Sequence, residues 1–162
     1  MRGQCLLLAA LVITTGAATW AAEDDGNLEP FVDKEFVIVR STPSFEEARQ
    51  SAVTAAANLG VRLDLRGLSP HERTGLTFSS EVCTRGDFPY PCYVPRGRWD
   101  DGTYVSVEWS NGYESFSKGL YVVTVVSDVP GSAKTSRMLA AARRVYPDAY
   151  AKRVKVYVGC MH

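Results

Sequence analysis

Residues 120–158 read LYVVTVVSDVPGSAKTSRMLAAARRVYPDAYAKRVKVYV, and this stretch indicates how the chain folds. Leu120–Ser127 is rich in β-branched residues, which is typical of a buried strand. Ser132 can cap a helix that continues to about Tyr146. Lys152–Val158 then alternates apolar and polar side chains, as a half-buried strand does. The stretch therefore predicts a strand–helix–strand unit.

The same order of elements occurs earlier in the chain. Phe36–Ser41 (FVIVRS) predicts a strand, and Ser44 with Glu47 three residues later forms a capping box. The helix should run from there to Leu59, and Val61–Arg66 alternates like a second strand. The two halves, residues 36–66 and 121–158, form an internal pseudo-repeat. We therefore expect an α+β domain with an antiparallel sheet and two helices on one of its faces.

An insertion at about residues 68–119 separates the two halves. It contains Cys83 and Cys92, and it includes the alternating segment Thr103–Trp109 followed by the turn signal Asn111-Gly112. The alternating segment should extend the sheet or form a hairpin with Tyr121–Val126. The expected architecture is thus completed by an inserted, disulfide-stapled loop and a β-hairpin.

The N-terminal residues 1–22 have the pattern of a signal peptide. Arg2 precedes the apolar run Cys5–Ile13, and Thr19 and Ala21 occupy the −3 and −1 positions of a cleavage site. About ten apolar residues are too few to span a bilayer. We expect a periplasmic or secreted protein with a flexible acidic leader at 23–34 and a single domain at 35–162.

An oxidising location favours a disulfide between Cys83 and Cys92, and Cys160 is then left over. A metal site built from these three cysteines and His162 is the alternative, but their spacing matches no standard zinc pattern. The sequence therefore predicts a disulfide and neither a metal ion nor a cofactor.

Composition and motifs exclude several classes of function. Eighteen basic residues balance eighteen acidic ones, so no overall positive field favours nucleic acid. Apolar stretches after the signal peptide are too short for a membrane span. No nucleophile elbow or metalloprotease motif is present, and Asp100 and Asp101 are more typical of a turn than of an acid pair with Glu108. We therefore expect a protein that is not an enzyme.

The sheet face opposite the helices is the candidate binding surface. Aromatic rings stack on sugars, and Arg or Lys donors suit the hydroxyls and carboxylates of glycans. Ordinary solvated positions of an antiparallel sheet would show the same alternation. The outward positions proposed for binding are Arg62, Arg66, Tyr104, Thr124, Arg153 and Tyr157.

The two strand–helix–strand halves, with residues 121–157 and the turn Tyr-Pro-Asp-Ala-Tyr-Ala-Lys-Arg at 146–153, resemble the SPOR (sporulation-related repeat) domain. The resemblance implies a ferredoxin-like βαβ–βαβ sandwich that binds peptidoglycan glycan strands, especially those stripped of stem peptides. The first strand of that family commonly reads Gln-x-Gly-Ser-Phe. Ser41 and Ser127 occupy the place of the serine in the two halves and join the proposed glycan-binding residues.

Two further functions compete with glycan binding. The protein could be an inhibitor or immunity protein that binds a cell-wall-active enzyme through the insertion, at Cys83 to Trp99. The aromatic residues of the insertion would then form a recognition surface rather than a second small core. A structural envelope subunit is the third possibility, and it predicts dimers linked through Cys160.

Overall fold

The computed structural model of the protein describes residues 30–159. The predicted signal peptide, residues 23–29 of the predicted leader, Cys160 and His162 lie outside the described residues. Within residues 30–159, no helix is both long enough and apolar enough to cross a membrane.

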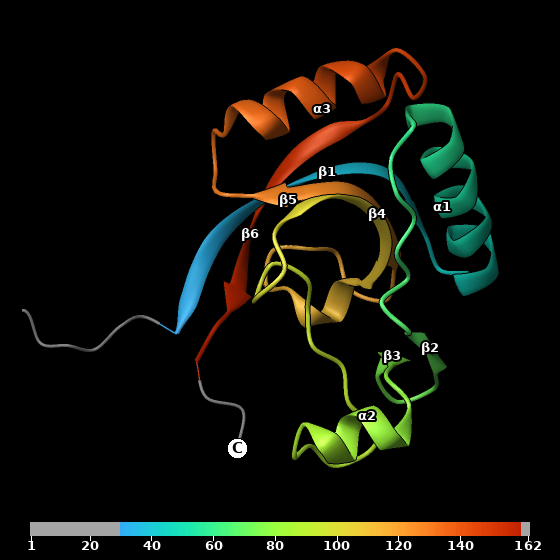
Figure 1. Ribbon diagram of the computed structural model, residues 1–162, viewed down its shortest axis with the longest axis vertical. Coiled ribbons are helices and arrows are strands. Elements are labelled where there is room, and N and C mark those ends of the chain that lie inside the picture. Colours follow the sequence, from blue (N-terminus) through green and yellow to red (C-terminus); the bar gives the residue numbers. More distant parts are fainter. Residues whose placement is uncertain (1–29, 160–162) are drawn as a thin grey trace, which may run out of the picture.

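A four-stranded antiparallel sheet forms the centre of the domain (Figure 1). Its strands are β1 (Phe31–Thr42), β4 (Gly102–Trp109), β5 (Tyr121–Asp128) and β6 (Tyr150–Tyr157), in the order β4-β5-β1-β6. β5 thus lies between β1 and β4, and β1 lies between β5 and β6. The predicted α+β class, antiparallel sheet and pairing of β4 with β5 are confirmed.

Two helices, α1 (Phe45–Leu59) and α3 (Ala133–Arg143), pack on one face of the sheet (Figure 1). The Ser44 hydroxyl accepts a hydrogen bond from the Glu47 amide, and Gly60 ends α1 with a left-handed φ of 62°. The predicted start and end of this helix are confirmed. Small side chains let α1 approach the sheet closely. The core on this side contains Ala48, Ala52 and Ala55 of α1, Ala142 of α3, and Val37, Val105, Val107, Val123 and Val125 of the strands.

Two predicted boundaries were wrong. β1 begins at Phe31, so the last four residues of the predicted leader, 31–34, belong to the sheet, where they pair with β6. Val61–Arg66 is not a strand and forms only an isolated parallel bridge between Leu63 and Val105. Positive φ angles at Arg66 (58°) and Gly67 (65°) turn the chain away before a ladder can form. β4 takes the place in the sheet that the sequence predicts for residues 61–66.

The prediction of an open sheet face was also wrong, because part of the insertion covers it. Phe36, Ile38, Val122, Val154 and Val156 of the sheet pack against the insertion side chains Tyr113 and Phe116. Val154 and Val156 therefore point away from the helices, which reverses the orientation expected for β6. The sheet lies between a helical layer and a layer of irregular chain (Figure 1).

The rest of the insertion forms the end of the molecule opposite α3 (Figure 1). It contains the short hairpin of β2 (Ser69–His71) and β3 (Gly75–Thr77), and the helix α2 (Ser80–Arg85). A single 3₁₀ turn, η1 (Ser110–Gly112), follows β4.

Candidate binding site in the insertion

The predicted disulfide joins α2 to the segment that returns beneath it. Cys83 and Cys92 are bonded and buried. The Phe78 amide donates to the Cys92 carbonyl at 2.9 Å, and the Thr77 hydroxyl accepts from the Cys92 amide at 3.1 Å. Ser79 caps α2 by accepting from the Val82 amide. These contacts hold residues 78–92 as one ordered loop.

A buried carboxylate organises the inner part of the insertion. Glu108 on β4 is 1% exposed, and its Oε2 accepts hydrogen bonds from Tyr93 at 2.8 Å and Tyr113 at 3.1 Å. The same oxygen pairs with Arg66 Nη1 at 2.9 Å, and Oε1 accepts from the Ser106 hydroxyl at 2.8 Å. Glu108 therefore connects β4 of the sheet to the segment after α1 and to the loops before and after β4.

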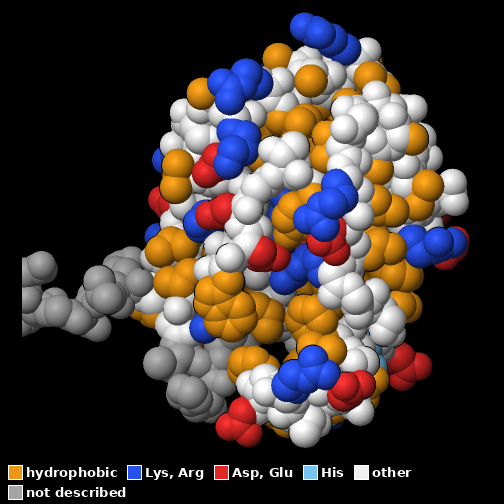
Figure 2. Space-filling model, viewed as in Figure 1, with side chains coloured by type: hydrophobic (Ala, Val, Ile, Leu, Met, Phe, Trp, Pro, Cys, Tyr) orange, Lys and Arg blue, Asp and Glu red, His pale blue; other side chains and the backbone are white. Residues whose placement is uncertain are grey.

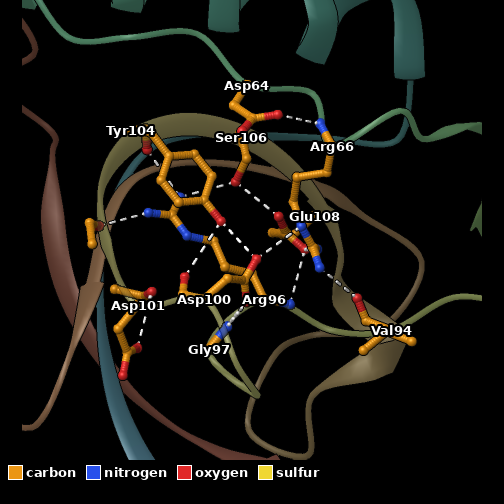
Figure 3. Close-up of polar contacts among 12 residues, drawn as sticks. Asp64, Arg66, Val94, Arg96, Gly97, Asp100, Asp101, Tyr104, Ser106 and Glu108 are labelled. Atoms are coloured by element: carbon orange, nitrogen blue, oxygen red, sulfur yellow. Dashed lines mark hydrogen bonds and ion pairs between the residues drawn. The ribbon is translucent and has the colours of Figure 1, made fainter.

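Arg96 is fully buried in the same cluster (Figure 3). Its guanidinium lies 3.5 Å from the centre of the Tyr104 ring and donates to the Gly102 carbonyl (2.8 Å), the Tyr104 carbonyl (2.9 Å) and the Ser106 hydroxyl (3.0 Å). Burial lowers the pKa of Arg96. Because this side chain reaches back to β4, it ties the loop of residues 95–102 to the sheet.

Arg66 connects this cluster to the surface. Its Nε lies 3.1 Å from Asp100 Oδ2, and its Nη2 donates to the Val94 carbonyl at 3.0 Å. Burial alone would lower the pKa of Arg66, but the charges of Glu108 and Asp100 raise it above its ordinary value. Figure 3 shows Arg66 directed toward Glu108 and Val94. Arg66 therefore serves to hold the insertion in place.

The tyrosines of the cluster should make the domain sensitive to alkali. Burial raises the pKa values of Tyr93, Tyr104 and Tyr113 above 10. In the unfolded chain these phenols lose protons near pH 10, so the unfolded state binds fewer protons above that pH and stability falls as the pH rises. We expect their ionisation, followed by absorbance at 295 nm, to coincide with unfolding followed by circular dichroism. Ionisation of all tyrosines before unfolding would contradict this assignment.

An apolar pocket lies between α2 and the loop that Arg66 and Arg96 fix. Its volume is about 300 Å³. Trp99 at its rim is 70% exposed, and Val82 on α2 is 43% exposed. In Figure 2, hydrophobic side chains border a hollow in the lower half of the molecule, with charged side chains directly above it. The lining residues of this insertion pocket are Arg66, Phe78, Val82, Gly86, Phe88, Cys92, Val94, Trp99 and Asp100.

The turn that presents Trp99 is held by hydrogen bonds to Asp100. The Gly97 amide donates to Asp100 Oδ1 at 3.0 Å, and Gly97 has a φ of 88°, which favours glycine. Asp100 also accepts from the Tyr104 hydroxyl at 2.8 Å. The Arg98 guanidinium stacks on Trp99 at 4.6 Å from the ring centre. An exposed aromatic ring on an ordered turn loses little conformational freedom when it binds a partner.

Three of the predicted glycan-binding residues are buried. The Tyr104 ring packs against the guanidinium of Arg96, as described above. The Thr124 hydroxyl donates to the Val37 carbonyl at 2.8 Å, and the Ser127 hydroxyl donates to Asp101 at 3.3 Å. These side chains support the strands and are inaccessible to a glycan.

The other five predicted residues do not share one surface. Arg66 is held by its ion pairs, whereas Ser41, Arg62 and Arg153 are exposed. Ser41 and Tyr157 lie toward opposite ends of β1, since Phe31 is the register partner of Tyr157. Arg62 pairs with Asp64 at 2.8 Å beside the edge of β4. The structure thus separates residues that the alternating pattern and the family resemblance had placed on one binding surface.

The carboxylates considered for acid chemistry also have structural partners. Asp100 binds Arg66 and Tyr104, Asp101 pairs with Lys34, and Glu108 is buried. Among residues 30–159, no group of three His, Cys, Asp or Glu side chains is placed to hold a metal ion. Cys83 and Cys92 are bonded to each other, which removes them from the alternative metal site.

Sequence reasoning missed Trp99, Phe88 and Val82 as neighbours. The only sequence signal for this group was the aromatic content of the insertion together with the disulfide.

Comparisons of the chain with protein-family models, curated proteins and solved structures find no match.

Proposed function

We propose that residues 30–159 form a non-enzymatic module that binds another protein through the insertion pocket. The observation that carries this proposal is the exposed Trp99 beside an ordered apolar pocket of about 300 Å³. Hot spots of protein interfaces are enriched in tryptophan and lie next to pockets that exclude water. The pocket suits an aromatic or branched aliphatic side chain of the partner.

An exported inhibitor or immunity protein fits this arrangement. Disulfides persist in oxidising compartments, so the Cys83–Cys92 bond supports a location outside the cytoplasm. The strand order supports a ferredoxin-like topology, because β1 of the first half lies between β5 and β6 of the second half.

Binding of peptidoglycan glycan strands is the second candidate. The interleaved strand order agrees with the topology that the SPOR resemblance implies. The covered sheet face counts against the surface first expected for it. Arg153 and Tyr157 on β6 remain the residues through which this candidate can be tested.

Selection of displayed peptides against residues 22–162 tests the first candidate. We expect enriched peptides to share an aromatic or leucine anchor, and Trp99→Ala to weaken their affinity roughly 30-fold, about 2 kcal/mol. Tyr90→Ala is the matched control, because Tyr90 is an exposed aromatic residue of the same insertion that does not line the pocket.

Co-sedimentation with purified sacculi, intact or amidase-stripped, separates the two candidates. Enrichment on stripped sacculi that is lost in Arg153→Ala and Tyr157→Ala, and kept in Trp99→Ala, would replace the protein-binding proposal with glycan binding. Selected peptides that bind Trp99→Ala as tightly as the original chain would also overturn it.

A further inference from the structure

The charges of the domain are unevenly distributed. Residues 129–158, which contain α3 and β6, carry seven Lys and Arg and a single acidic residue, Asp148, a net charge of +6. Residues 30–128 carry ten basic and thirteen acidic residues, a net charge of −3. The balanced composition of the whole chain therefore conceals a strongly basic end. Figure 2 shows Lys and Arg side chains gathered over the upper end of the molecule, where α3 lies.

The outer face of α3 carries much of this charge. Thr135, Met138, Leu139 and Ala142 pack toward the sheet. Arg137 and Arg144 are exposed on the opposite side of the helix, seven residues and about 10 Å apart. Neither arginine forms an ion pair with any of the described residues. Their charges are therefore available to a partner.

β6 carries a further exposed arginine on the sheet next to α3. Arg153 is exposed and pairs in register with Glu35, whose carboxylate accepts from the Gly131 amide just before α3. Arg153 therefore lies near the start of the helix, and Arg144 lies at its end. We call Arg137, Arg144 and Arg153 the basic crest.

Helix stability explains only part of this pattern, because Arg143 in the last turn and Arg144 at the C-cap offset the negative end of the helix dipole. Negative side chains stabilise the first turn of a helix, yet the first turn of α3 contains Lys134 and no acidic residue. Lys134 pairs with Asp128 at 3.0 Å, outside the helix. No carboxylate lies between Asp128 and Asp148 to offset the crest through helical neighbours.

Apolar side chains are exposed at both ends of α3. Val129 precedes the helix and is 56% exposed, and Val145 follows it and is 43% exposed. The apolar face of α3 is covered by the sheet, so these two valines, and not the helix face itself, are the apolar side chains that can enter the headgroup boundary beside the arginines. Charge complementarity selects an anionic surface over a zwitterionic one.

We infer that the basic crest binds the surface of an anionic phospholipid bilayer. The helix α2, which lines the insertion pocket through Val82, lies at the opposite end of the long axis from α3 (Figure 1), so a protein bound in this orientation would direct the pocket away from the membrane. This inference is independent of the proposed function, because no residue of the crest lines the insertion pocket.

Vesicle flotation with residues 22–162 tests the inference, since this chain contains every described element and lacks the apolar run Cys5–Ile13. We expect binding to vesicles of phosphatidylglycerol and phosphatidylcholine in 50 mM salt, and little binding to phosphatidylcholine alone. Changing all three crest arginines to glutamine should weaken binding roughly 100-fold, about fivefold for each arginine. Raising the salt to 0.5 M should release the protein, because the contacts are exposed.

A control variant removes three positive charges from outside the basic crest. Arg62, Arg73 and Arg85 are exposed and lie outside α3 and β6, and changing all three to glutamine should leave binding to the anionic vesicles nearly unchanged. Equal loss in both triple variants would overturn the inference in favour of non-specific attraction. Retention of the protein on immobilised polyglutamate without vesicle binding would overturn it in favour of an acidic protein partner.

Discussion

Replacing Glu108 with leucine is expected to lower the free energy of unfolding by about 3–5 kcal/mol, because it removes one partner of a buried ion pair. Arg66 would keep Asp100 but lose its buried carboxylate, and the hydroxyls of Tyr93 and Tyr113 would lose their shared acceptor. Urea unfolding followed by circular dichroism measures the change.

A matched control distinguishes this loss from the general effect of removing a carboxylate. Glu46→Gln breaks an exposed pair with Arg49 on α1 and should leave stability nearly unchanged. Glu108→Gln keeps an acceptor oxygen and should fall between the two. A loss below about 1 kcal/mol in Glu108→Leu would show that the insertion is held mainly by its apolar contacts.

Removing the disulfide should have the second largest effect. Changing Cys83 and Cys92 together to serine frees a loop closed over a sequence separation of nine, which corresponds to about 2–3 kcal/mol of stability through the entropy of the unfolded chain. Val82 directly precedes Cys83 and Phe88 lies within this loop, and both line the insertion pocket. We therefore expect weaker binding of the selected peptides as well as lower stability.

Reduction of the unaltered protein with dithiothreitol provides an independent comparison. It should reproduce the stability of the double serine variant, whereas the double variant itself should not respond to the reductant. Peptide affinity that stays the same after reduction would show that the disulfide does not shape the pocket.

The helices α1 and α3 and the four strands of the main sheet could be predicted because their signals are local, whereas α2, β2 and β3 were not predicted. The capping box at Ser44, the alternation in β6 and the β-branched run in β5 each lie within a few residues. The alternation of apolar and polar residues could not show whether residues 61–66 or residues 103–109 form the strand next to β5, because both segments alternate with a period of two. The choice between them depends on the backbone turn at Arg66 and Gly67.

The covered sheet face was unpredictable for a different reason. Tyr104, Ser106 and Glu108 are polar at alternate positions, which is the pattern of a strand facing water. Their partner Arg66 lies 42 positions from Glu108 in the sequence, and Arg96 lies 8 to 12 positions from the three strand residues. Only the folded insertion brings these side chains together. Buried polar side chains that bind one another leave the same sequence pattern as solvated ones.

The pairing of β1 with β6 brings both ends of the described chain to one corner. Phe31 is the register partner of Tyr157, and the Pro30 carbonyl accepts from the Val158 amide at 2.6 Å. Arg98 strengthens this corner by donating to the carbonyl of Tyr157. Residues 30–159 could therefore be grafted into a surface loop of a host protein, or permuted by joining their ends with a short linker, without rerouting a strand.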